Sequence, residues 1–299
     1  MAIHGRQEQV MNKHLRLYKQ DYFISEINSV TVEKRDHQQP FPLHDHDFHE
    51  IVIVCSGNGL HHWNDYIYPI TSGDILYITP KDIHGYESVN NLKLFNILYL
   101  RETLFLSTII EKYLPKHNAK HTERVWRINP SFIKQLSPLV DQLTLESKKN
   151  NLASVHLSEA LFLQLVILLD RIKQVPNEQS PTATHQLDLL FTTLHNSIGS
   201  SFNLEMFCKQ NHIAKRSISR LFKSQTGMTI NEYLQKRRLC NAMSLLRNTQ
   251  YSISMISSEC GYDDSNYFSV VFKKETQQTP SQYRAKFKDK INKNLNLLN

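Results

Sequence analysis

Two stretches near the carboxyl end of the chain, ISRLFKSQTGMTINEYL (218–234) and FSVVFKKETQQTPSQYR (268–284), decide the fold of that region. They align at a constant offset of 50 residues, which pairs Phe222 with Phe272. Each stretch follows a short apolar segment and a turn. A short helix, a tight turn and a second helix make up a helix-turn-helix, so this internal repeat predicts two such units.

The second helix of each unit is expected to bury one face and to present the opposite face to the major groove of DNA. Helical periodicity turns Ile218 and Phe222 inward in the first copy, and Phe268 and Phe272 in the second. The residues expected to face DNA are Arg216, Ser219, Arg220 and Lys223 in the first copy and Ser265, Asn266, Ser269 and Lys273 in the second. Arginine pairs bidentately with guanine, so we expect the first copy to read bases more strongly. Ordinary solvated helix faces are the alternative.

Positive charge is concentrated in the same part of the chain. The chain has 35 Lys and Arg residues and 28 Asp and Glu residues. Residues 181–299 hold 16 of the basic and 8 of the acidic residues, which leaves 19 basic and 20 acidic residues in the first 180 positions. Basic residues gain affinity for nucleic acid by releasing counterions from phosphate. The charge distribution therefore favours a DNA-binding module joined to a neutral domain, with a solvated basic surface as the alternative.

The segment GYDDSNYFSVVFKKETQQTPSQYR (261–284) resembles the signature of the DNA-binding domain of the AraC/XylS family of transcription regulators. The matching positions are Gly261, Tyr267, Phe268, Phe272, Lys273, Pro280 and Arg284. The resemblance implies two helix-turn-helix units joined by a long helix, here from Thr229 to about Arg247. The chain departs from the pattern at Gln277, where a glycine usually ends the helix and where the first copy has Gly227. Because only glycine takes the left-handed cap without strain, we expect a looser helix end there.

The amino-terminal part has a different period. Between residues 20 and about 105, short apolar stretches such as EIVIVC and LFNILYL alternate with turn signals and predict an antiparallel sandwich or barrel. From about 130 to 174 the apolar residues recur at helical spacing. The second helix there is apolar nearly all round, so packing against its own barrel, a dimer seam, or both are expected to cover it.

The stretch HDHDFHEIVIVCSG contains His44, His46 and Glu50 and resembles the first motif of the cupin barrel, where these residues often hold a transition metal. In the second motif, Asp82 stands where glycine is usual and His84 comes one residue early. A metal-dependent cupin enzyme is therefore an alternative. Sensor domains fused to this type of DNA-binding domain commonly use the barrel as a small-molecule pocket, and the resemblance implies that role, with no metal and no other cofactor.

Sugar recognition in such a barrel requires a few converging polar side chains and an aromatic ring against the pyranose face. The candidates for effector binding are His44, His46, Glu50, Trp63, His84, Tyr86 and Asn96. Each of them has a plain alternative as a satisfied core residue.

Together these patterns and resemblances predict an α+β two-domain fold. Residues 1–174 are expected to form a cupin-like β-barrel with a helical dimerisation segment, and residues 175–186 a linker that contains two prolines. Residues 187–299 are expected to form an all-α DNA-binding domain with two helix-turn-helix units.

Within the AraC/XylS family, HDFHEIVIVCSGNGLHHWNDYIYPITSGDILYI (46–78) and MTINEYLQKRRLC (228–240) are very similar to the activators of rhamnose catabolic operons. This likeness implies L-rhamnose as the effector, a homodimer on repeated half-sites of promoter DNA, and recruitment of RNA polymerase. Regulators for other sugars share much of the pattern, so another sugar is the alternative.

Cysteine usage and hydropathy bear on the compartment. Cys55, Cys208, Cys240 and Cys260 form no closely spaced pair and are expected to be buried, reduced thiols. The first residues lack the apolar core of a signal peptide, and the most apolar run, at 161–169, is shorter than the ~20 residues of a membrane span. We therefore expect a cytoplasmic protein that does not contact a membrane.

Overall fold

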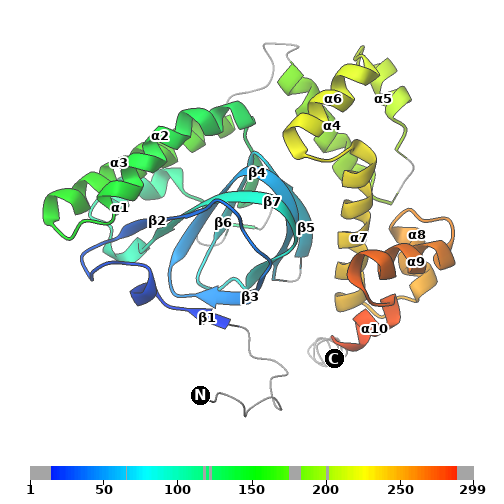
Figure 1. Cartoon of the computed structure of the whole chain (residues 1–299), viewed down its shortest axis with the longest axis horizontal. Helices are drawn as coiled ribbons and strands as arrows, with labels where there is room; N and C mark the ends of the chain where they lie inside the picture. Colours follow the sequence, from blue (N-terminus) through cyan, green and yellow to red (C-terminus); the bar gives the residue numbers. More distant parts are fainter. Residues whose placement is uncertain are drawn as a thin grey trace.

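The structure, a computed structural model, describes residues 15–64, 66–116, 119–120, 123–174, 183–199 and 202–287. Its amino-terminal half is built on an eight-stranded sheet that curls into a barrel (Figure 1). The strands are β1 (Leu15–Leu17), β2 (Val30–Arg35), β3 (Phe41–His46), β4 (His49–Trp63), β5 (Tyr66–Thr71), β6 (Asp74–Ile78), β7 (His84–Tyr99) and β8 (Val125–Arg127). The order is β1-β3-β7-β4-β6-β8, with β2 paired to β7 and β5 to β4. Every pairing except the parallel one between β1 and β3 is antiparallel, as predicted.

The two longest strands, β4 and β7, pair along most of their length and carry the bend of the barrel. Their register shifts three times between Val54 and Leu60. Gly57 lies inside this bulged stretch with a φ of 74°, and a Cβ there would be 2.1 Å from the carbonyl oxygen of Asn91. Only glycine fits such a close approach of two backbones, so Gly57 is what lets the two strands bend together.

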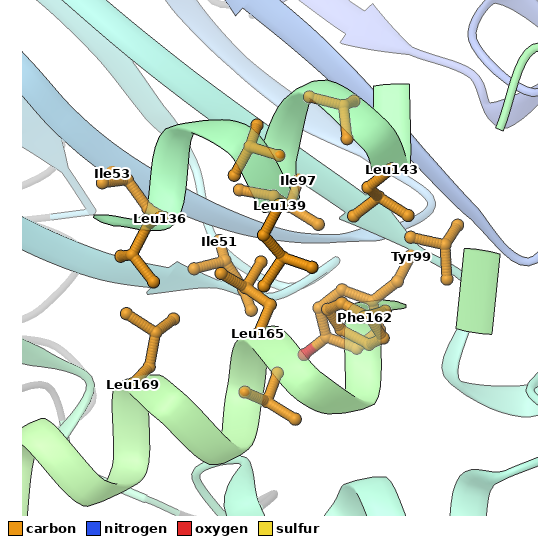
Figure 2. Packing of buried hydrophobic residues seen from close by; sticks show 14 of the residues in the cluster. Ile51, Ile53, Ile97, Tyr99, Leu136, Leu139, Leu143, Phe162, Leu165 and Leu169 are labelled. Atoms are coloured by element: carbon orange, nitrogen blue, oxygen red, sulfur yellow. The ribbon is translucent and has the colours of Figure 1, made fainter. Parts of the chain in front are cut away.

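Helices α2 (Pro130–Glu146) and α3 (Leu152–Gln174) cover one outer wall of the barrel, and the short α1 (Ser107–Ile110) lies beside them (Figure 1). Figure 2 shows apolar side chains of both helices packed on those of the strands. Its labelled residues are Ile51, Ile53, Ile97, Tyr99, Leu136, Leu139, Leu143, Phe162, Leu165 and Leu169. Packing of the apolar helix against its own barrel is thus confirmed, whereas the dimer seam stays a prediction.

The apolar character of α3 extends beyond the most apolar run of the sequence at 161–169. By length and composition, Leu152–Lys173 could cross a membrane. Half of its most apolar window is buried, and Phe162, Leu165 and Leu169 in it are fully covered by the barrel core. Those contacts make α3 a core helix.

The carboxyl-terminal half is helical throughout the residues that the structure describes. Its helices are α4 (Ala183–Asn196), α5 (Leu204–Gln210), α6 (Lys215–Thr226), α7 (Ile230–Asn248), α8 (Ile253–Glu259), α9 (Ser265–Thr276) and α10 (Pro280–Ala285). The predicted long helix is confirmed as α7, which opens with a capping box between Thr229 and Glu232. Helix α4 begins at Ala183, so the last four residues of the predicted linker, 183–186, are helical; residues 175–182 lie outside the described residues.

The two halves touch through α7, which runs beside β5 (Figure 1). Leu60 and Ile67 of the β4–β5 hairpin share one apolar cluster with Leu239 and Met243 of α7. The sequence contains no signal for this contact, because its partners are separated by many residues and belong to different periodic patterns.

The four cysteines are free thiols. Cys208, Cys240 and Cys260 are buried as expected, and Cys55 is half-buried. Burial raises the pKa of Cys240 and of Cys260 to about 12, so both are protonated and poorly nucleophilic at neutral pH.

Candidate functional site

A pocket of about 270 Å³ lies in the barrel, with walls from β2, β3, β4 and β7. It lies just below the range of roughly 300–1,000 Å³ that is usual for small-molecule sites. Alternate residues of a strand share a face, which explains why lining residues that are two positions apart on one strand both point into the pocket. Six of the seven residues predicted to bind the effector line it: His44, His46, Glu50, His84, Tyr86 and Asn96.

The seventh candidate, Trp63, is fully buried and is not part of the pocket lining. The guanidinium carbon of Arg124 lies 4.7 Å from the centre of its ring, and Arg124 also makes two hydrogen bonds to Asp82. Burial opposes ionisation of Asp82, but the hydrogen bonds from Arg124 and from Thr79 outweigh it and lower its pKa to about 2. Trp63 therefore packs under an ion pair, and its place does not support a stacking role against a sugar.

Other aromatic rings line the pocket in its place. Tyr22, Phe41 and Phe48 are part of the wall, and the ring of His46 stacks on Phe48 with centroids 4.3 Å apart. Sequence reasoning missed these three residues. A local signal was available for Phe48, which lies two residues after His46 and so shares its face. Phe41 lies three residues before His44 and reaches the pocket across the register shift in β3, which the sequence does not reveal.

A chain of hydrogen bonds fixes the orientation of the histidines. His46 Nδ1 donates to the carbonyl oxygen of Phe48 at 2.7 Å. His84 Nδ1 lies 3.3 Å from His61 Nε2, and His61 Nδ1 lies 3.1 Å from the hydroxyl of Tyr68. Burial, with the neighbouring histidines, lowers the pKa of His84 well below its usual value, and burial also lowers the pKa of His44. Both rings are therefore neutral at pH 7.

Four polar atoms of pocket residues are buried with no hydrogen-bond partner among the described residues: His46 Nε2, His84 Nε2, Tyr86 Oη and Asn96 Oδ1. Burial raises the pKa of Tyr86 well above its usual value, so its phenol stays protonated and can donate. An unpaired buried polar group costs about 1–3 kcal/mol, which a ligand hydroxyl placed beside it would offset. The wall thus offers both donors and acceptors next to aromatic rings.

The first helix-turn-helix consists of α5 and α6, and it has the faces that periodicity predicts. Ile218 and Phe222 are buried, while Arg216, Arg220 and Lys223 are exposed. Ser219, the remaining candidate in this unit, is half-buried. The exposed side of α6 is therefore strongly basic; contacts of these residues with DNA bases stay a prediction.

The second helix-turn-helix consists of α8 and α9, where Phe268 and Phe272 are fully buried. Asn266 and Lys273 are exposed, whereas Ser265 and Ser269 are half-buried. The hydroxyl of Ser269 donates to the carbonyl oxygen of Ser265 at 2.9 Å. That proton is therefore used within the helix, and contacts of these residues with DNA bases stay a prediction, as they do for α6.

Both second helices end in a left-handed residue. Gly227 follows α6 with a φ of 71°, and Gln277 follows α9 with a φ of 61°. Their N–H groups donate to the carbonyl oxygens of Lys223 and Lys273 at 2.9 and 2.8 Å. The looser end expected at Gln277 is not observed, because Gln277 adopts the glycine-like conformation despite its Cβ.

Polar contacts join the barrel to the helical half. Arg247 of α7 is buried; its Nε donates to the hydroxyl of Tyr283 at 2.8 Å, and its Nη2 donates to His62 Nδ1 at 3.2 Å. His62 Nε2 in turn donates to Glu87 at 2.7 Å. At the other end of the interface, Asn58 of β4 donates to the carbonyl oxygen of Thr226 at 3.3 Å. The barrel thus contacts α6 of the first helix-turn-helix unit directly, and it contacts α7, the helix that joins the two units.

Comparison with known proteins matches both halves. A family model described as an AraC-like ligand binding domain matches residues 26–166, and one described as a helix-turn-helix domain matches residues 207–286. An HTH-type transcriptional activator RhaR from Mannheimia succiniciproducens is 50% identical over 277 residues, covering 93% of this chain and 99% of that protein. One from Pectobacterium atrosepticum is 44% identical over 273 residues, covering 91% and 96%. Among solved structures, the C-terminal domain of the response regulator yesN from Fusobacterium nucleatum is 31% identical, covers 32% of this chain and 95% of that one, and has a TM-score of 0.31.

Proposed function

We propose, because this chain belongs to the AraC family of helix-turn-helix transcription activators, that it activates promoters in response to L-rhamnose. The chain is a DNA-binding regulator and not an enzyme, since its relatives are transcriptional activators over nearly their whole length. The metal-dependent cupin enzyme is therefore set aside. In this reading the pocket senses a sugar and performs no chemistry on it.

The pocket is the observation that carries the choice of ligand. A deoxyhexose combines hydroxyls that both donate and accept with apolar C–H faces and a methyl group. Tyr86 and Asn96 present unpaired polar atoms for the hydroxyls, and Phe41 and Phe48 present rings for the apolar faces. The resemblance of the sequence to rhamnose-responsive regulators supports L-rhamnose among the sugars with this chemistry.

Strand β4 offers a direct route from the pocket to the DNA-binding half. His61 contacts His84 of the pocket, and the next residue, His62, contacts Arg247 of α7. Neighbouring residues of a strand point to opposite faces, so a ligand that shifts the inner face of β4 also shifts its outer face. For activation, L-rhamnose must bind one arrangement of the two halves better than the other.

Further parts of the proposal rest on the family. The protein works in the cytoplasm as a homodimer on repeated half-sites of promoter DNA and recruits RNA polymerase. The sensing and dimerisation domain spans residues 1–174, the linker 175–186 and the DNA-binding domain 187–299, with the effective linker shortened by the early start of α4 at Ala183.

Calorimetric titration of the full-length protein with L-rhamnose, L-fucose, L-arabinose and D-mannose tests the ligand. We expect saturable binding of L-rhamnose without turnover. Tyr86→Phe removes one hydroxyl from the wall and Asn96→Ala removes one amide, and each should cost about 1–3 kcal/mol of binding free energy. Tyr66→Phe, at an exposed tyrosine of β5, is the matched control and should bind as the wild type does.

Binding of another sugar in the panel, with L-rhamnose ignored, would keep the regulator class and replace the effector. Equal affinity of the wild type and both wall variants would instead place the sugar outside this pocket.

A further inference from the structure

The outer face of α9 has an apolar side chain at its centre. Val270 is 67% exposed, the largest exposed fraction of any large apolar side chain that the structure describes. Phe268 and Phe272 are fully buried, and at about 3.6 residues per turn Val270 lies half a turn away from the midpoint between them. Ser265 and Ser269, which were expected to read bases, are half-buried and lie nearer the buried side.

The 50-residue repeat gives Val270 an equivalent in the first unit. Val270 corresponds to Arg220, and Asn266 corresponds to Arg216. All four side chains are exposed. In each unit a buried phenylalanine packs on the tyrosine of the next helix in nearly the same geometry, so equivalent positions of α6 and α9 face outward alike. At the same two places, α6 therefore presents two guanidinium groups, whereas α9 presents an amide and an isopropyl group.

The surroundings of Val270 fit DNA better than an apolar partner. Its neighbours one turn away on the helix surface are Asn266, Tyr267, Lys273 and Lys274, all of them exposed. The two ammonium groups attract phosphate, and one aliphatic group among polar ones makes too small an apolar patch to bind a protein. In the major groove, thymine is the base that presents a methyl group. A single aliphatic side chain on a basic helix face matches that feature.

An aliphatic side chain in the major groove discriminates between base pairs in two ways. It gains apolar contact with the 5-methyl group of thymine. Against a G·C pair it would cover hydrogen-bonding groups without replacing the water that it displaces, which costs free energy. Asn266 lies one turn earlier, about 6 Å along the helix axis, and its amide can pair with adenine. Both side chains thus favour A·T pairs, one or two steps apart at roughly 3.4 Å per step.

We propose that Val270 packs on the 5-methyl group of a thymine, so that α9 selects an A·T pair where the equivalent Arg220 of α6 selects a G·C pair. One repeated unit thereby reads two different kinds of base pair within a half-site. The inference rests on the proposed binding of promoter DNA through the second helix of each unit, and not on the choice of effector.

The first experiment selects binding sites for the full-length protein from random-sequence duplexes, with and without L-rhamnose. Val270→Arg should prefer a G·C pair at a position where the wild type prefers A·T, because arginine pairs with guanine. The reciprocal change Arg220→Val should replace a G·C preference by A·T at another position of the site. Identical selected sites for the wild type and Val270→Arg would overturn the proposal.

The second experiment removes the methyl group itself. Each thymine of the selected site is replaced in turn by deoxyuridine, which lacks only that group. At one thymine the wild type should bind about fourfold more weakly after replacement, the effect of exposing one methyl-sized group. Val270→Ala should bind both duplexes equally there. Val271→Ala, the same change at the next, half-buried residue, is the matched control and should keep the wild-type ratio.

Thermal denaturation shows that each variant is folded; Val270→Ala should be at least as stable as the wild type, because alanine is the better helix former at an exposed position. Equal wild-type affinity for thymine and deoxyuridine at every position overturns the proposal, as does a Val270→Ala variant that keeps the thymine preference. Normal site binding by Val270→Ala with reduced activation of transcription would assign the side chain to a protein partner instead. A thymine preference that depends on Val270, in a protein that does not respond to L-rhamnose, supports the proposal and overturns the proposed effector.

Discussion

The two helix-turn-helix units have nearly the same interior and different surroundings. The rings of Phe222 in the first unit and Tyr233 in the following helix lie 5.4 Å apart at 77°, and those of Phe272 in the second unit and Tyr283 in its following helix lie 5.5 Å apart at 76°. A threonine one turn after each phenylalanine donates to that residue's carbonyl oxygen at 2.8 Å in both units. The repeat in the sequence is thus a repeat of packing geometry.

Their outer surfaces and their contacts with the barrel differ. Helix α6 begins without a side-chain cap and carries exposed arginines, whereas α9 is capped by Asp264, which accepts from the N–H of Asn266 at 2.8 Å. Asn58 contacts α6 of the first unit directly, whereas His62 contacts Arg247 of α7, which in turn donates to Tyr283 in the helix after the second unit. The comparison shows that the buried residues determine the fold of each unit. The exposed helix face and the contacts with the barrel are what distinguish one unit from the other.

The largest effects should come from the shared interior. Phe222→Ala and Phe272→Ala each empty a fully buried site and should each lower the free energy of unfolding by about 3–5 kcal/mol. Urea denaturation followed by circular dichroism measures both. Losses that differ by several kcal/mol between the two variants would contradict the equivalence of the two interiors.

DNA reading should separate the units. Arg216→Ala or Arg220→Ala should weaken binding to the target promoter by about 1–3 kcal/mol, because each removes a potential bidentate contact to guanine. Asn266→Ala on the second unit is the matched change and should cost less. Fluorescence anisotropy with labelled promoter DNA at a fixed salt concentration measures both losses of binding free energy. An equal loss for the variants of α6 and α9 would mean that the two helices contribute equally to base recognition.

The caps should respond with opposite signs. Gly227→Ala forces a Cβ into the left-handed region and should destabilise the protein by about 1–2 kcal/mol. Gln277→Gly removes such a strain and should stabilise it by up to about 1 kcal/mol, the relief being partly offset by the greater freedom of glycine in the unfolded chain. Thermal denaturation of the two variants is the measurement; a loss of stability in Gln277→Gly would mean that the glutamine side chain contributes more than its backbone strain costs.

The smallest effect should be a pH dependence of the contact at His62, which the contact of Asn58 with the first unit lacks. The hydrogen bond from His62, opposed by burial, lowers the pKa of Glu87 below its ordinary value of 4.5. A carboxyl group with a lowered pKa stabilises the folded state above its ordinary pKa, and this contribution is lost as the pH falls through the lowered value. The melting temperature of the wild type should therefore fall more steeply below about pH 4.5 than that of Glu87→Gln. The difference is small because the Glu87 side chain is 50% exposed and such pairs contribute roughly 0–1 kcal/mol to stability. Parallel profiles of melting temperature against pH in the two proteins would show that Glu87 does not stabilise this contact.

Local patterns predicted much of this molecule, because they act over a few residues. The 50-residue repeat located both helix-turn-helix units, and the helical spacing from Ile133 onward located the helices over the barrel. Strand alternation brought His44 and His46 to one side of β3. Each of these features follows from residues that are close in the chain.

The parts that could not be predicted depend on contacts between distant residues. Residue type and spacing place Trp63 in the pocket, but Arg124, about sixty residues later in the chain, covers its ring. The contact of His62 with Arg247 joins two segments 185 residues apart that share no periodic pattern. Residue type and spacing determine the face on which a side chain lies, but not what the rest of the chain places on that face.

Both tryptophans of the chain, Trp63 and Trp126, belong to the barrel. Arg124 lies over the first, and Lys173 lies 4.6 Å from the ring centre of the second. Intrinsic tryptophan emission of the unlabelled protein therefore comes from the barrel half alone. A change in that emission when promoter DNA is added would show that DNA binding alters the conformation of the barrel. This coupling would run in the reverse direction to the one in which the effector acts.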